Sequence, residues 1–216
     1  MIDLDFAING VEIARRSATP LLLFKLRVAN PTPNVPIEHV MVQAQIRIEA
    51  AHRDYTPSER ERLSDLFGAG EDWSRGLRGL LWANASVSIP GFVGECTVDL
   101  PVPCSQDFEI AATGFFDGVE EGDAPLSFLF SGPIFFRNED GDLQIAQIAH
   151  HKEAGFRLPL AVWRSLMATH YADTVWLRLD RDLFEAIGRY KRRERLPGMG
   201  EALRALLARA AAEPRR

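Results

Sequence analysis

The chain has 216 residues, of which 46% are hydrophobic and 25% charged, so it can bury one sizeable core or one core with a small helical appendage. No apolar run approaches the roughly 20 residues of a membrane span, and residues 1–5 alternate apolar and acidic side chains, unlike a signal or transit peptide. We therefore expect a cytoplasmic protein with no membrane span.

The net charge of −5 hides an asymmetry along the chain. Residues 178–216 carry 11 basic and 6 acidic side chains, whereas residues 99–142 carry ten carboxylates and one arginine. Acidic side chains are interspersed in the basic region and aromatic residues are not, which argues against nucleic-acid binding. An acidic partner, or the acidic middle of the chain itself, is the expected counterpart of the basic region.

Two cysteines bear on the redox state. Cys96 and Cys104 match neither a zinc spacing nor a thioredoxin-like pair. We expect two part-buried thiols, with a disulfide between them as the alternative.

Alternating patterns in the first half of the chain predict β-strands. Apolar side chains recur at every second position in residues 2–8, continuing to Ile13 after a bend at Asn9-Gly10, and again in residues 21–28 and 40–49. No helix-sized crossover separates these segments, so the sheet should be antiparallel.

A helical insertion follows these strands. Thr56, Pro57 and Glu59 form a capping-box start, and Gly68 should end the helix. A glycine-broken loop with one irregular helical turn is expected over residues 70–79. Further strands are predicted over residues 80–89, ending at a Pro90-Gly91 turn, and from residue 96 to residue 100, stopped by prolines 101 and 103.

The second half mixes helices with a hairpin. We expect a helix capped by Ser105, an acidic linker over residues 117–123, and a hairpin that starts at residue 124 and turns at residues 138–141, with Leu143 and Ile145 beginning its return strand. A polar run, residues 150–153, should lead into a helix opening at Leu158-Pro159. Then come a short strand at residues 175–179, a helix capped by Asp180, a last helix over residues 201–212, and a disordered Arg215-Arg216 end.

These elements predict an α+β fold with a largely antiparallel, curved sheet, helices on one side and a C-terminal helical section. A sandwich-like core is the alternative. We expect one α+β domain over residues 1–195 and a helical appendage over residues 196–216.

The run His150, His151, Lys152 and Glu153 is the densest group of side chains that could do chemistry. On an extended backbone His151 and Glu153 share a face, so they are the candidate metal ligands, with Asp99 or Glu95 as a third donor. The run lacks the spacing that places two imidazoles on one helical face, and the competing interpretation is a strand end with helix-capping or surface-pairing residues.

Other motifs disfavour an enzyme. Ser86 and Ser88 have no nucleophile-elbow context, the glycines of residues 68–79 form neither a phosphate loop nor a dinucleotide fingerprint, and the acidic linker lacks the order of a calcium loop. We expect no catalytic residues and no cofactor. The candidates for interaction with a partner are His150, Lys152, Arg157 and Trp82, although core packing is favoured for Trp82.

Several short motifs together resemble a known family. They are Arg47-Ile48-Glu49, Tyr55-Thr56-Pro57, Leu81-Trp82, the residues from Val98 to Cys104, Phe130-Ser131-Gly132, the residues from His151 to Ala154, and those from Leu158 to Trp163. The chain resembles, over nearly its whole length, an uncharacterised bacterial family, common in actinobacteria, whose genes tend to lie in clusters for actinobacterial-type nickel–iron hydrogenases. That family usually has an aromatic residue where this chain has His150, which speaks against a two-histidine site.

The resemblance implies a non-enzymatic accessory protein that binds a protein partner, such as a hydrogenase subunit or a maturation factor, in hydrogenase maturation, assembly or support. A metal- or small-ligand-binding protein that uses His151 and Glu153 is the alternative. A homodimer formed through exposed edge strands, such as the N-terminal one, is a third expectation.

Overall fold

The structure, a computed structural model, describes residues 2–32, 35–104, 110–138, 140–171 and 179–212. The chain divides into two compact units, Met1–Thr174 and Val175–Arg216. None of the described helices is long and apolar enough to cross a membrane.

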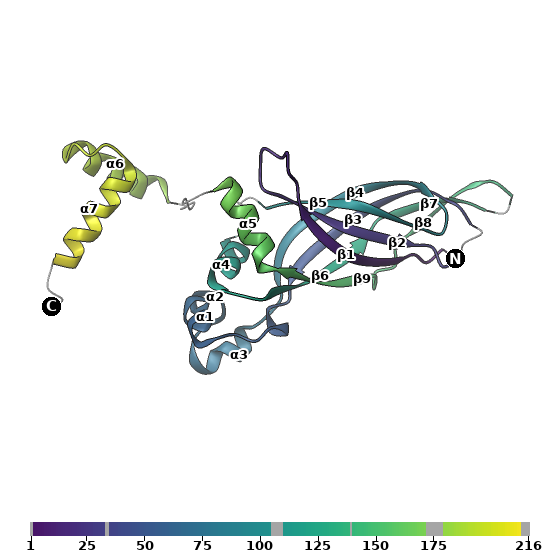
Figure 1. Ribbon diagram of the computed structural model, residues 1–216, viewed down its shortest axis with the longest axis horizontal. Helices are drawn as coiled ribbons and strands as arrows, with labels where there is room; N and C mark the ends of the chain where they lie inside the picture. The colour runs from purple at the N-terminus through teal and green to yellow at the C-terminus, as the bar shows by residue number, and fades with distance from the viewer. Residues whose placement is uncertain (1, 33–34, 105–109, 139, 172–178, 213–216) are drawn as a thin grey trace. The chain divides into compact units, whose positions relative to one another are not determined.

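The first unit contains two antiparallel sheets, which confirms the predicted α+β fold (Figure 1). One sheet has the order β1-β2-β5, and the other has the order β8-β7-β3-β6-β9 with β4 paired to the other side of β3. The strands are β1 (Asp5–Ile13), β2 (Leu21–Ala29), β3 (Ile37–Ile48), β4 (Leu80–Phe92), β5 (Glu95–Pro103), β6 (Asp123–Ser131), β7 (Pro133–Arg137), β8 (Leu143–Gln147) and β9 (Glu153–Pro159).

The two sheets pack face to face around an aromatic core. Alternate side chains of β2, including Leu22 and Phe24, are fully buried, as the period of two predicts. Phe24 of β2 meets Phe128 of β6 with ring centroids 5.0 Å apart, and Phe6 of β1 stacks on Phe130 of β6 at 4.7 Å. These contacts across the sheets make the core a sandwich, the alternative that the sequence left open.

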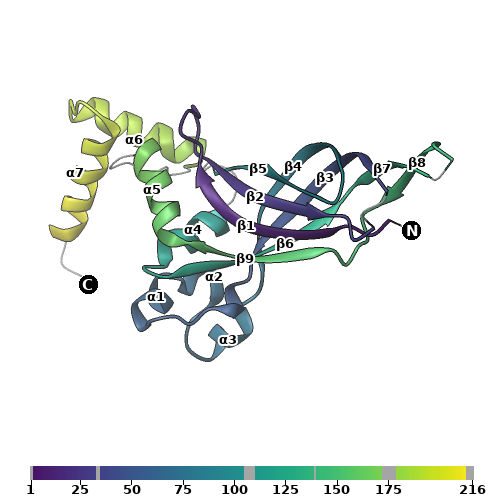
Figure 2. The same ribbon diagram turned by 45° about the vertical axis from the view of Figure 1, so that its right-hand side comes forward.

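The helices of this unit gather at one end of the sandwich (Figure 2). They are α1 (Pro57–Arg62), α2 (Ser64–Phe67), α3 (Trp73–Gly76), α4 (Ile110–Gly118) and α5 (Leu160–His170), with single 3-10 turns at Ala50–His52 and Gly70–Asp72. Trp82 of β4, Phe116 of α4 and Trp163 of α5 pack on one another there, with centroid distances of 4.0 to 5.9 Å. The helices thereby close that end of the core.

The predicted capping box is present, because the Thr56 side chain accepts from the Glu59 N–H and the Glu59 side chain accepts from the Thr56 N–H. The predicted helix is interrupted at Leu63, which separates α1 from α2, and Gly68 ends α2. The irregular turn expected over residues 70–79 is also confirmed.

An ion pair fastens these helices to the sheet, and we call it the Arg53–Glu59 clamp. Arg53 Nη2 lies 2.6 Å from Glu59 Oε1, and the two side chains are only 9% and 2% exposed. Arg53 also donates to the carbonyl oxygens of Glu121 and Asp123, at 2.7 and 2.8 Å, while Glu59 Oε1 accepts from the Glu120 N–H at 2.8 Å. The clamp therefore joins the start of α1 to the chain entering β6.

The prediction that Pro90, Pro101 and Pro103 end their strands is wrong. Pro90 lies within β4, opposite His39, and Pro101 and Pro103 lie within β5, opposite Leu23 and Leu21. Both strands are edges of their sheets. Cys104 N donates to Pro20 O, so alternation points the nitrogens of Pro101 and Pro103 away from β2, and no ladder hydrogen bond is lost.

The expected direct passage from the polar run into a helix is wrong, because β9 lies between them and pairs with β6. Ala154 and Leu158 are buried on one face of β9, whereas Glu153 and Arg157 are exposed on the other. This alternation is typical of a half-buried strand, although no strand was predicted there.

The second unit contains α6 (Arg181–Arg193) and α7 (Met199–Ala212), which pack on each other. Asp180 caps α6 by accepting from the Leu183 N–H, as predicted. The proposed domain boundary after residue 195 falls between these two helices and stays a prediction. The predicted Ser105 cap, most of the predicted strand at residues 175–179 and the Arg215-Arg216 end lie outside the described residues.

Candidate functional site

The strands β6 to β9 form one long hairpin that is interrupted midway. β6 and β7 both pair with β3, and the returning strands β9 and β8 pair with β6 and β7 respectively. Gly132 separates β6 from β7 at a φ of +129°, and a Cβ there would lie 1.9 Å from the Met41 carbonyl oxygen. Only glycine fits this close approach, so β7 and β8 form a distinct arm beyond it.

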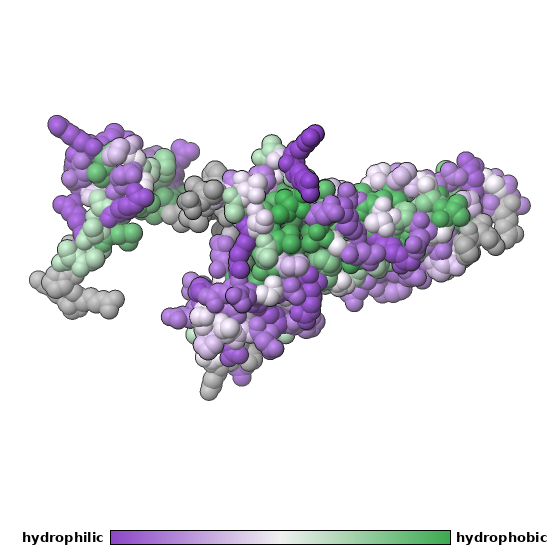
Figure 3. Space-filling model, viewed as in Figure 1, coloured by the Kyte–Doolittle hydropathy of each residue, from purple (hydrophilic) through white to green (hydrophobic). Residues whose placement is uncertain are grey.

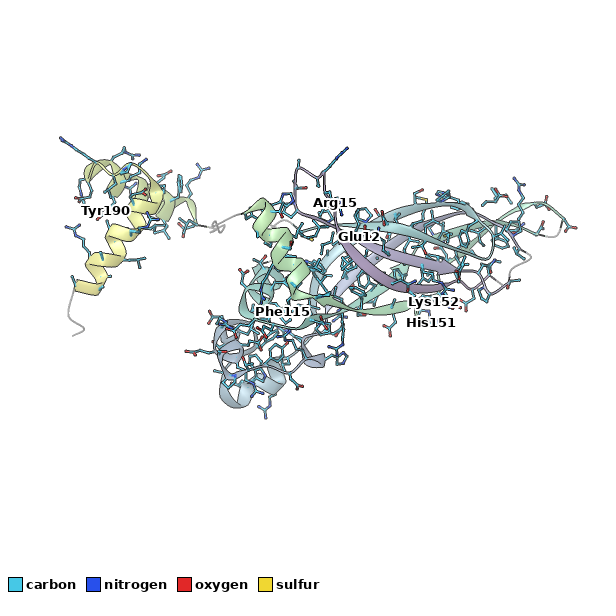
Figure 4. All side chains as sticks on the ribbon, in the orientation of Figure 1. Glu12, Arg15, Phe115, His151, Lys152 and Tyr190 are labelled. Atoms are coloured by element: carbon cyan, nitrogen blue, oxygen red, sulfur yellow. The ribbon has the colours of Figure 1, made fainter. Side chains whose placement is uncertain are left out.

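The returning strand bulges out opposite Gly132. Ile148 N donates to Gly132 O and Phe130 N donates to Lys152 O, each at 2.9 Å, so residues 149–151 have no place in the ladder. We call these residues the histidine bulge. His150 and His151 are both exposed there, with ring centroids 5.6 Å apart. Figure 4 labels His151 and its neighbour Lys152.

Lys152 is engaged within the protein. Its ammonium lies 3.0 Å from Asp3 and 3.2 Å from Asp5, so it holds the N-terminal segment against the start of β9. Burial acts to lower the pKa of Lys152, but the hydrogen bonds to Asp3 and Asp5 outweigh it and raise that pKa. Lys152, a predicted partner-binding residue, therefore already forms ion pairs within the protein.

The candidate metal ligands are not brought together with a third donor. His151 and Glu153 are exposed, while Asp99 pairs with Lys25 at 2.8 Å and Glu95 pairs with Arg27, both in the other sheet. Within the described residues no three His, Cys, Asp or Glu side chains are grouped to hold a metal ion. A metal site at His151 stays a prediction. The described residues supply no third ligand for it.

Glu153 and Arg157 do line one groove of 510 Å³, together with Glu49, His52 and Ser127. Arg157 donates from Nη2 to the His52 carbonyl oxygen at 3.4 Å. Trp82, another predicted interaction candidate, is instead a core residue. It is buried among Phe24, Phe116 and Trp163 and presents no face to a partner.

The side chains that could act as nucleophiles are not activated. Both cysteines are free thiols; burial raises the pKa of Cys104 to about 12 and also raises that of Cys96. The Ser88 hydroxyl lies 3.0 Å from His39 Nε2 on the outer face of the larger sheet. Among the described hydrogen bonds no carboxylate orients His39, so this pair lacks the third member of a catalytic triad.

The most exposed apolar side chains of the larger sheet were not among the predicted site residues. Leu143 and Ile145 of β8 are 56% and 62% exposed, and Ile145 lies opposite Phe135 of β7. Met41 of β3 is exposed on the same outer face. We call Met41, Phe135, Leu143 and Ile145 the arm patch. Elsewhere too the surface of this unit is not uniformly polar, since the face drawn in Figure 3 shows hydrophobic areas between hydrophilic ones.

Local sequence explains why the arm patch was missed. The alternation of Leu143 and Ile145 with Gln144 correctly predicted a return strand. However, Ile134 of β7 is buried and lies opposite Ala146, so the inward positions of β8 are Gln144 and Ala146. The larger apolar side chains therefore face out, against the usual rule.

Comparison with known proteins places the chain in a family. A model of a family of unknown function (DUF6084) matches residues 1–215. The chain belongs to the DUF6084 family. An uncharacterised family is what the sequence motifs indicated, while the link of DUF6084 to hydrogenase genes stays a prediction.

Two further comparisons add little about the DUF6084 chain. The solution structure of a putative late embryogenesis abundant (LEA) protein matches 72% of this chain and 71% of its own at 17% identity. Its TM-score of 0.27 is too low to carry an argument. No curated protein matches the sequence.

Proposed function

We propose that the protein is a non-enzymatic accessory protein that binds a protein partner through the arm patch, in nickel–iron hydrogenase maturation, assembly or support. The observation that carries the binding role is the exposure of Leu143 and Ile145 on an arm that extends beyond the Gly132 break. The resemblance of the sequence to a family encoded beside hydrogenase genes supports the choice of partner.

The composition of the arm patch supports protein binding. Interfaces combine exposed apolar anchors with a polar rim and few charges at the centre. Around the patch, the outer face of β3 and β6 presents Gln43 and Ser131. Arg137 lies directly opposite Leu143 and is paired with Glu38 at 3.0 Å, so the charge that adjoins the patch already has a partner. An apolar partner surface could bury these anchors without leaving a charge unpaired.

Co-purification tests this proposal. The tagged protein, expressed in an actinobacterial host that makes a nickel–iron hydrogenase, should recover a hydrogenase subunit or a maturation factor. Ile145→Glu should reduce the recovered amount about tenfold or more, because a carboxylate would be buried at the centre of the interface.

Val93→Glu is the matched control, since Val93 is also highly exposed, at 66%, but lies between β4 and β5. Its recovery of partner should equal that of the wild type. Recovery of no hydrogenase-related protein by the wild type would overturn the hydrogenase role, and unchanged recovery by Ile145→Glu would overturn the arm patch as the binding surface.

A further inference from the structure

The free edge of β8 differs from the other sheet edges in the described residues. Edge strands usually carry charges, prolines or bulges that block the addition of another strand. Such features occur on β1 (a bulge between Ile8 and Val11, with Asp5 and Glu12), β5 (Pro101 and Pro103) and β9 (Glu153 and Arg157). β4 has a proline only at position 90, but it contacts β5. Residues 143–147 of β8 contain no charge and no proline. The edge of β8 is therefore open to another strand.

The hydrogen-bond pattern shows which backbone groups that edge offers. Asn138 N donates to Asp142 O, and Ile148 N donates to Gly132 O, so residues 142 and 148 point their backbone groups toward β7. Antiparallel ladders alternate, which points those of Gln144 and Ala146 the same way. The N–H and C=O groups of Leu143, Ile145 and Gln147 therefore face the free edge.

We propose that this edge pairs with β8 of a second copy of the chain, in an antiparallel register centred on Ile145. In that register all three outward-facing residues of each copy are paired. Ile145 lies opposite Ile145 of the second copy, and Leu143 lies opposite its Gln147. Gln144 lies opposite Ala146 of the second copy, so no two like charges are opposed along the paired strands.

The segments that flank β8 favour the same register. Asp140 and Asp142 lie on the turn before β8, and His150 and His151 lie on the bulge after it. Asp140 and His150 are equally far from Ile145 along the chain, in opposite directions. Antiparallel pairing thus brings the acidic turn of each copy beside the histidine bulge of the other, which gives His150 and His151 a role that an isolated copy does not show.

Pairing also enlarges the surface that the proposed function uses, and to that extent this inference rests on the proposed function. The paired Ile145 side chains lie on the same face of the joined sheet, as do those of Leu143. The two arm patches then form one continuous apolar surface. Five residues per copy make a small interface, so the dimer should be weak and should form at micromolar concentrations.

Sedimentation equilibrium of the full chain tests the pairing. Between about 1 and 200 µM the weight-average mass should rise from 24.2 kDa toward twice that value. Ile145→Lys should remain at the monomer mass, because it places two ammonium groups opposite each other. Val93→Lys changes an exposed apolar residue of the turn between β4 and β5 and should behave as the wild type.

Two variants test the register. Ile145→Pro removes an N–H that β7 does not use, so it should leave the fold intact and abolish the dimer. Ile145→Cys should form an intermolecular disulfide under mild oxidation, because Cα atoms of directly opposed, hydrogen-bonded residues lie about 5.5 Å apart, within the range of a disulfide. Gln144→Cys, whose counterpart in the second copy is displaced along the strand, should not.

A wild-type chain that stays monomeric up to the highest concentration, with no crosslink in Ile145→Cys, would overturn the dimer. A dimer that survives Ile145→Pro would show that another surface forms it and would also overturn the proposal. Neither result depends on whether the chain binds a hydrogenase-related protein. Recovery of a hydrogenase-related protein by a monomeric chain would leave the proposed function standing, whereas a dimer that recovers none would leave only the pairing.

Discussion

The two ends of the larger sheet differ in how far their polar and apolar groups are buried and paired. At the helical end the Arg53–Glu59 clamp is buried and forms hydrogen bonds with backbone groups of residues 120–123, so its charged groups have partners within the protein. Arg53 Nε is the exception among the described residues. On the arm, by contrast, Leu143 and Ile145 are exposed and the adjoining edge of β8 is unpaired.

This difference indicates that one end of the sheet contributes to stability and the other end to binding. Groups that are already paired internally cannot gain from a partner, whereas exposed apolar side chains and free backbone groups can. We therefore expect substitutions at the helical end to change the free energy of unfolding, and substitutions on the arm to change association.

The largest effect should come from breaking the clamp. Glu59→Ala should lower the free energy of unfolding by about 3 to 5 kcal/mol, because the Arg53 guanidinium stays buried without its carboxylate. Urea denaturation followed by circular dichroism measures this change. Glu61→Ala removes an exposed carboxylate from the same helix and should cost less than about 0.5 kcal/mol. Equal losses in both variants would contradict the role of the clamp.

A smaller effect should appear as a pH dependence. Burial acts to raise the pKa of Glu59, but the N–H groups of Glu120 and Thr56 and the Arg53 guanidinium outweigh it and hold that pKa below its ordinary value of 4.5. Because the folded-state pKa is the lower one, this stabilisation is present above about pH 4.5 and is lost as the pH falls through the folded-state value.

Thermal unfolding between pH 7 and pH 3 measures this loss. Glu59→Gln cannot titrate at this position, so it should be less stable than the wild type at pH 7 and should lose less stability on acidification. An acid limb of unchanged steepness in this variant would assign the pH dependence to other carboxylates.

The smallest change in stability should come from the arm. Leu143→Ser should alter the free energy of unfolding by less than about 0.5 kcal/mol, because the leucine side chain is already largely in water. Leu22→Ala, in the fully buried β2 position, should lower it by about 2 to 5 kcal/mol. A marked loss of stability in Leu143→Ser would show that the arm patch is covered within the protein.

Much of the fold was predictable from local sequence. Period-two alternation located β1, β2, β3 and the two strands of the arm, and the bend at Asn9-Gly10 coincides with a bulge between Ile8 and Val11. Capping residues located helix starts at Thr56 and Asp180. These features depend on neighbours within a few residues, which a sequence shows directly.

Tertiary structure alone decided which strands are edges and which strand face is buried. Prolines 90, 101 and 103 signalled strand ends, yet they lie inside β4 and β5 because those strands pair on one side only. The spacing of Leu143 and Ile145 showed that they share a face, but Ile134 packing on the opposite face turned them toward water. Alternation specifies the residues that belong together, whereas the pairing of distant strands decides where they point.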